Sequence, residues 1–149
     1  MMSSETVNQL VERLTQAGDG RPAPLSAEGF AARLGAPLQP AGADAYWATY
    51  TFTLAGGPFA GGELRLNAAG SAALLILEPR DPPGLGRPDV DRQALGPRLG
   101  LRPNPNIPPE GVDAEYYQAG PAQLALQWTH TSHRLRSLVL EWPAPVKSR

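Results

Sequence analysis

The sequence predicts an α+β fold, in which N-terminal helices pack on a mainly antiparallel sheet of about five strands that ends in a β-hairpin. The first observation is a helical stripe of apolar residues near the N-terminus, between Val7 and Ala17. The second is a series of segments after Tyr46 in which apolar and polar residues alternate, as along a strand with one buried face. The third is the end of the chain, where two such segments flank a polar connector.

The first predicted helix follows the stripe that begins at Val7. Its apolar members have the spacing of one helix face: Val7, Leu10, Val11, Leu14 and Ala17. Ser3 or Ser4 can cap its start, because a serine hydroxyl accepts a hydrogen bond from a free N–H of the first turn. Gly18 can end it, because glycine readily adopts the left-handed conformation that closes many helices.

A second, short helix is predicted after a connector rich in glycine and proline. Ser26 is the expected N-cap, and Leu25 and Phe30 stand on either side of it at the spacing of a hydrophobic staple. Gly35 is expected to end this helix directly after Leu34.

A meander of strands is predicted next. Between residues 46 and 54 the even positions are apolar, and Trp47 falls on the opposite, threonine-rich face. Trp47 is therefore expected either to be covered by a helix or to be exposed for binding. Leu64 and Leu66 mark a second strand, and residues 72–77 indicate a third strand that is more fully buried.

The clearest pattern is the terminal hairpin. Leu124, Leu126 and Trp128 alternate with other residues in the first run, and Leu138, Leu140 and Trp142 do so in the second. The polar residues 129–134 join the two runs. We expect a β-hairpin that carries Trp128 and Trp142 on its buried face.

The chain is expected to form a single domain over residues 1–149, with a long Pro/Gly-rich loop at 79–121. Its 16 glycines and 17 prolines exceed average usage, and they are concentrated in that segment. Within it, a short helix is predicted around Asp89 to Leu95, because Pro88 suits a helix start and Gly96-Pro97 a helix end. Tyr116-Tyr117 is expected to begin a further short strand.

Composition excludes several classes of function. The 13 basic and 14 acidic residues give a net charge of −1, without the basic excess typical of nucleic-acid-binding proteins. The absence of cysteine excludes disulfides, thiolate nucleophiles and cysteine-ligated metals. The start of the chain lacks a signal-peptide pattern, and the longest apolar run, 72–77, is far shorter than the roughly 20 residues of a membrane span. We expect a cytoplasmic protein that binds no nucleic acid, no membrane and no cofactor.

The two histidines, His130 and His133, are the candidates for metal binding or acid–base chemistry. Their spacing on a turn could hold a metal with a carboxylate as third ligand. The simpler interpretation is two polar side chains in a hairpin connector, so we predict no metal site and no catalytic residue. Gly56–Gly62 is glycine-rich, but Glu63 and a strand pattern follow it instead of the Lys, Ser or Thr and helix of a phosphate-binding loop.

A partner-binding patch is the candidate functional surface that the sequence offers. Asp113, Glu115, Tyr116 and Tyr117 lie close together, and tyrosine is enriched at energetically important interface positions. Trp47 joins this set as the aromatic residue on a polar strand face. The simpler interpretation is that the tyrosines pack on the sheet while the acidic side chains are solvated.

The C-terminal half of the chain resembles small bacterial toxin-immunity proteins. The resemblance rests on Leu99-Gly100, a proline-rich loop, the tyrosine pair and the closing run Leu138–Trp142. The resemblance implies a protein that binds and neutralises a toxic enzyme. It assigns no functional residues, because that group shares no motif that could be transferred.

We therefore expect a non-catalytic, cytosolic protein-binding module, monomeric or homodimeric, with one protein partner, and the resemblance implies that this partner is a toxin. Two alternatives from other classes stay open. One is a small enzyme or ligand-binding protein with a pocket between sheet and helices and with His130 or His133 near its mouth. The other is a chaperone of a secreted protein, which the small size and mild acidity of the chain fit.

Overall fold

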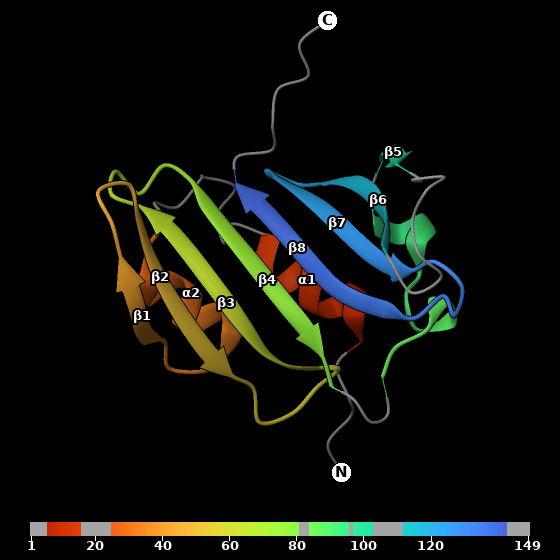
Figure 1. Ribbon diagram of the computed structural model, residues 1–149, viewed down its shortest axis with the longest axis horizontal. Helices are drawn as coiled ribbons and strands as arrows, with labels where there is room; N and C mark the ends of the chain where they lie inside the picture. Colours follow the sequence, from red (N-terminus) through yellow and green to blue (C-terminus); the bar gives the residue numbers. More distant parts are fainter. Residues whose placement is uncertain (1–5, 16–24, 81–83, 96, 103–111, 143–149) are drawn as a thin grey trace, which may run out of the picture.

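The computed structural model describes residues 6–15, 25–80, 84–95, 97–102 and 112–142. Within these ranges, two α-helices pack on one face of an eight-stranded antiparallel sheet (Figure 1). This architecture agrees with the α+β class, but the sheet has eight strands rather than about five. Neither described α-helix has the length and apolar character needed to cross a membrane.

The elements follow one another in a simple order. The helices are α1 (Val7–Thr15) and α2 (Ala27–Leu34). The first four strands are β1 (Gln39–Ala43), β2 (Trp47–Thr53), β3 (Phe59–Asn67) and β4 (Ala73–Pro79). Two short 3-10 helices follow, η1 (Arg87–Asp89) and η2 (Arg92–Leu95). The last four strands are β5 (Arg98–Arg102), β6 (Val112–Ala119), β7 (Ala122–Thr129) and β8 (Leu135–Trp142).

The sheet consists of two four-stranded meanders that meet along their last strands. The strand order is β1-β2-β3-β4-β8-β7-β6-β5, and β4 pairs with β8 in a register that sets Leu75 opposite Leu140. As a result β1 and β5 form the two edges of the sheet, while β4 and β8 lie at its centre (Figure 1).

The core lies between the helices and one face of the sheet. Leu64, Leu75, Leu140 and Leu124 form one row across β3, β4, β8 and β7, and all four are fully buried. The ring of Phe30 on α2 meets Trp142 edge-on, with ring centroids 5.1 Å apart. Burial of each such side chain contributes about 1.5–3 kcal/mol, so this layer provides most of the driving force for folding.

Both helices form where the sequence predicts them. The α1 stripe is buried at Val7, Leu10, Val11 and Leu14, while Ala17, Gly18 and the capping serines Ser3 and Ser4 lie outside the described residues. Ser26 caps α2, since its hydroxyl accepts a hydrogen bond from the N–H of Gly29 at 3.0 Å. Gly35 ends α2 in the left-handed conformation with φ of 69°, which explains why glycine is needed there.

The terminal hairpin is also confirmed. It consists of β7 and β8, and Trp128 and Trp142 are both buried on the helix-covered face, at 0% and 4% exposure. A register shift between Gln127 and Trp128 bends the pair near the connector. Alternation therefore predicted the strands and their buried faces, but it could not predict this bulge.

Two strands were missed, for identifiable reasons. The edge strand β1 contains Pro40 and Gly42, and every one of its residues is exposed, so it shows no alternation. The other edge strand, β5, lies inside the segment that was predicted to be one long loop. Described parts of that segment also contain η1, η2 and the whole of β6. The helix predicted around Asp89 to Leu95 is replaced by the two 3-10 helices. Residues 103–111 lie outside the described ranges.

Candidate functional site

A buried carboxylate organises one end of the sheet. Glu115 lies on β6 in the alternation that also turns Tyr117 towards the helix-covered face, and it is only 3% exposed. Its Oε1 accepts a hydrogen bond from Nε1 of Trp128 on β7 at 2.8 Å and a longer one from the Tyr117 hydroxyl at 3.4 Å. Strand pairing thus fixes the position of this carboxylate.

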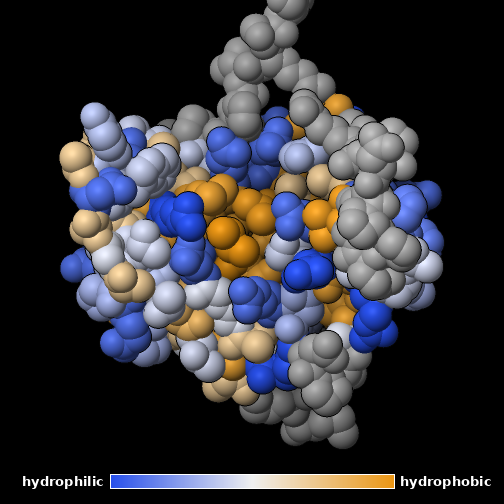
Figure 2. Space-filling model, viewed as in Figure 1, coloured by the Kyte–Doolittle hydropathy of each residue, from blue (hydrophilic) through white to orange (hydrophobic). Residues whose placement is uncertain are grey.

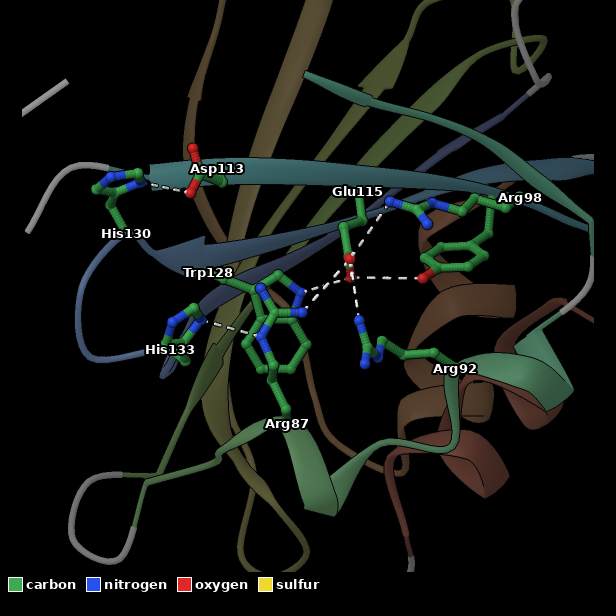
Figure 3. Close-up of polar contacts among 9 residues, drawn as sticks. Arg87, Arg92, Arg98, Asp113, Glu115, Trp128, His130 and His133 are labelled. Carbon is green, nitrogen blue, oxygen red and sulfur yellow. Dashed lines mark hydrogen bonds and ion pairs between the residues drawn. The ribbon is translucent and has the colours of Figure 1, made fainter. Parts of the chain in front are cut away.

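Three arginines from three different elements converge on the other oxygen of Glu115. Its Oε2 lies 3.4 Å from Arg87 of η1, 3.1 Å from Arg92 of η2 and 3.7 Å from Arg98 of β5 (Figure 3). The Arg87 guanidinium also stacks on the Trp128 ring, 4.9 Å from its centroid. We call Glu115 and these three arginines the arginine cluster.

The arginine cluster keeps Glu115 ionised. Burial by itself would raise the pKa of this carboxyl, but the hydrogen bond from Trp128 and the charges of Arg92 and Arg87 outweigh it and lower the pKa below its usual value. Burial and the neighbouring Glu115 charge raise the pKa of Tyr117, although Arg92 and Arg98 oppose that shift. A carboxylate held by so many donors is a weak base, so Glu115 fits a structural role better than proton transfer.

The two histidines make contacts in different directions. Nδ1 of His130 lies 2.7 Å from Oδ2 of Asp113, whereas Nδ1 of His133 accepts a hydrogen bond from Nε of Arg87 at 3.1 Å (Figure 3). His133 also has a left-handed backbone, with φ of 54°. Within the described ranges, no three His, Cys, Asp or Glu side chains gather as metal ligands, so a metal site that unites these histidines gains no support.

The residues predicted as one partner-binding patch are divided between the two faces of β6. Glu115 and Tyr117 are each 3% exposed and take part in the arginine cluster or its surroundings, so their burial favours a structural role, and their role as direct partner contacts stays a prediction. Asp113 shares their face, and its Oδ1 is buried without a hydrogen-bond partner among the described residues. Tyr116 lies on the opposite face of the sheet, half-buried.

The face of the sheet opposite the helices, which we call the open face, carries an apolar centre. Ile76, Val139 and Ala125 are direct neighbours across β4, β8 and β7, and Leu74 lies beside them on β4. Ile76, Leu74 and Val139 remain partly exposed. Figure 2 shows this face, with an apolar region at its middle surrounded by hydrophilic side chains. The neighbouring positions on this face are polar: Glu63, Arg65, Glu78, Gln123, Gln127, Ser137 and Glu141.

Two exposed aromatic residues stand at the start of β2: Trp47 has the register of the open face, and Tyr46 lies in the turn before the strand, where it lines a hollow with Leu25. Tyr46 is 75% exposed and Trp47 is 38% exposed, which makes them the large apolar side chains most accessible to solvent among the described residues. Oδ1 of Asp44 accepts hydrogen bonds from the backbone N–H groups of both, each at 2.8 Å. These bonds also lower the pKa of Asp44. Tyr46 was expected on the buried face; it lies in the turn before β2 instead.

The open face also contains a shallow pocket of about 600 Å³. It lies where β4, β7 and β8 approach the hairpin connector, and its lining includes Glu78, Gln127, Ser137, Arg134 and Arg136. Neither His130 nor His133 lines it. The mixture of one carboxylate, two guanidinium groups and neutral hydrogen-bonding side chains shows no arrangement specific to one reaction.

Sequence reasoning missed the arginine cluster. Its members come from residues 87, 92, 98 and 115, which are brought together only by the pairing of β5 with β6 and by the course of η1 and η2. The sequence did contain one signal: Glu115 shares a strand face with Tyr117, so an acidic side chain falls on a face that is otherwise buried. Comparisons with protein-family models, with curated proteins and with solved structures found no match to this chain.

Proposed function

We propose that this chain is a non-catalytic protein-binding module that receives one protein partner on the open face of its sheet. The observation that carries the proposal is the apolar centre formed by Ile76, Val139 and Ala125 on a face that neither described helix covers. Apolar surface ringed by polar groups is typical of protein interfaces.

The two exposed aromatic residues support the same proposal. Tyrosine and tryptophan are the residue types that most often dominate binding energy. Tyr46 and Trp47 are exposed, and Asp44 fixes the backbone on which both stand. A surface that is ordered before binding loses less conformational entropy when the complex forms.

The composition of this surface supports a folded protein as the partner. The apolar centre would receive an aliphatic or aromatic side chain of the partner, while Gln123, Gln127 and Ser137 would exchange hydrogen bonds with polar groups around it. The rim carries charges of both signs: Glu63, Glu78 and Glu141 are acidic, and Arg65 and Arg136 are basic. A folded protein surface of mixed polarity fits this rim better than a strongly charged polymer does.

The more specific form of the proposal is that the partner is a bacterial toxin and that this chain is its immunity protein. It is supported by the resemblance of the C-terminal half of the chain to toxin-immunity proteins. The described residues of the open face also suit the binding of a partner better than they suit a reaction centre. A small-ligand-binding protein is the second candidate, and the 600 Å³ pocket on the open face is the observation that favours it.

The test begins with capture of partners from the source cells by the tagged full-length chain. Wild-type protein is compared with Trp47→Ala and Ile76→Glu, and with Glu28→Ala as a matched control on α2, on the other side of the molecule. We expect one stoichiometric partner that is retained by wild type and the control and is reduced about tenfold or more by either substitution. Circular dichroism must show that both variants are folded.

The outcomes separate the candidates. Equal capture by all four proteins would rule out the open face as the binding surface. A purified partner whose enzymatic activity stops on addition of this chain would support the immunity form. Absence of any stoichiometric protein partner would contradict the proposal and favour the ligand-binding candidate.

A further inference from the structure

The arginine cluster carries more positive charge than its own carboxylate balances. Three guanidinium groups lie within ion-pair distance of Glu115, and no other described acidic side chain pairs with them. The nearby acids are committed elsewhere: Asp113 pairs with His130, and Oδ2 of Asp89 accepts the N–H of Gly86. The cluster therefore retains about two uncompensated positive charges.

The excess charge reaches the surface through two of the arginines. The side chains of Arg92 and Arg98 are 39% and 50% exposed, whereas that of Glu115 is 4% exposed. Arg92 uses Nη1 to bond Glu115, whereas the side chain of Arg98 forms only the ion pair and no hydrogen bond to a described residue. Each guanidinium has five N–H donors in a planar fork, and the contacts with Glu115 use only a few of them.

Arg87 differs from these two because it is already occupied. It bonds Glu115 and His133 and stacks on Trp128, so its position is fixed by three contacts. It contributes its charge to the local field while Arg92 and Arg98 keep free donors. Glu115 holds the guanidinium groups close together despite their mutual repulsion, which orders them before any ligand arrives.

We propose that Arg92 and Arg98 form a binding site for an oxyanion, either a phosphate group or a carboxylate. Planar, paired N–H donors of arginine match the oxygens of both groups. Glu115 acts as a positioning residue behind the site and does not contact the ligand. The site lies on η2 and β5, apart from the residues of the open face, so it is independent of the proposed partner surface.

The experiment is a titration of the ¹⁵N-labelled full chain, followed at the arginine Nε–H resonances. The probes are inorganic phosphate and acetate, with sodium chloride at the same ionic strength as reference. We expect saturable shifts at Arg92 and Arg98, and tighter binding of one probe identifies the favoured oxyanion. Arg98→Gln should weaken binding about tenfold, because hydrogen bonds to charged groups are the strongest of their kind.

Arg65→Gln is the matched control, because Arg65 is also about half exposed and pairs with a single carboxylate, Glu63. It should leave the titration unchanged. Shifts at Arg92 and Arg98 that equal those in chloride or that fail to saturate would overturn the proposal. Saturable shifts at Arg87, the third arginine on Glu115, that persist in Arg92→Gln/Arg98→Gln would also overturn it. Because the side chains of both arginines are exposed, we expect these variants to fold. The backbone amide spectrum of each variant checks this expectation.

Discussion

Glu115 and Trp128 lie on neighbouring strands, and the indole Nε1 of Trp128 donates a 2.8 Å hydrogen bond to Oε1 of Glu115. The same indole ring stacks against Arg87, whose guanidinium reaches the other carboxylate oxygen. One aromatic side chain therefore contacts both signs of charge in the cluster. These contacts connect η1 with β6 and β7. The packing of this end of the sheet therefore depends on Glu115.

Replacement of Glu115 by glutamine should destabilise the protein strongly. The substitution preserves shape but leaves three arginines without their shared carboxylate. Because these arginines are partly exposed, we expect a cost of about 1.5–3 kcal/mol, as for a lost hydrogen bond to a charged group. Urea denaturation, read from the midpoint and slope, measures the change in the free energy of unfolding.

The matched control is Glu63→Gln, which removes a carboxylate from the exposed pair with Arg65. Exposed pairs contribute less than about 1 kcal/mol, so this variant should remain close to wild type. Similar decreases in the free energy of unfolding in the two variants would contradict the view that Glu115 stabilises the fold more than an exposed carboxylate does.

Stability should also depend on pH through Glu115. Because the folded state lowers the pKa of this carboxyl, the folded protein binds fewer protons than the unfolded chain in the acidic range. The stabilisation is complete above the unfolded pKa near 4.5 and is lost as pH falls through the lower, folded pKa. Asp44, whose pKa is also lowered, acts in the same direction.

Urea midpoints measured between neutral pH and pH 3 check this expectation. Wild type should lose stability below about pH 4.5 more steeply than Glu115→Gln, which no longer titrates at this position. Parallel profiles for the two proteins would show that Glu115 makes no pH-dependent contribution.

Gly62→Ala should destabilise the centre of the sheet. A Cβ at this position would collide with the carbonyl oxygen of Ile76 on the neighbouring strand, and backbone atoms cannot move aside as a flexible side chain can. Overpacking of this kind costs about 1–3 kcal/mol. Gly56→Ala is the control, because open space surrounds that position, and its thermal midpoint should remain near that of wild type.

Asp44→Ala should weaken partner binding without altering the core. The substitution removes the acceptor for the N–H groups of Tyr46 and Trp47 and so releases the turn that presents both rings. Asp44→Asn retains a side-chain oxygen and should restore most of the affinity, which is measured by calorimetry with the captured partner. Full affinity in Asp44→Ala would show that order in this turn is not needed.

The sequence was most informative where local pattern and burial coincide. The Ser26 cap, the Gly35 end and the alternation of the terminal hairpin are each determined by residues close together in the chain, and all are found in the structure. The edge strand β1 could not be predicted because an exposed strand has no alternation, and Pro40 argues against a strand altogether. The arginine cluster depends on tertiary pairing, which no short stretch of sequence encodes.

The strand order has a kinetic consequence. Six of the seven described strand pairings join neighbours along the chain, and only β4 with β8 links distant segments, bringing Ala73 opposite Trp142. Each meander can therefore assemble from local contacts. The β4–β8 pairing, which we call the seam, can form only after β8, the last strand, is available. Closure of a long loop is slow because its entropy is lost before the contacts form. Formation of the β4–β8 seam is thus the expected rate-limiting event of folding, and substitutions along it should slow folding more than those at either edge.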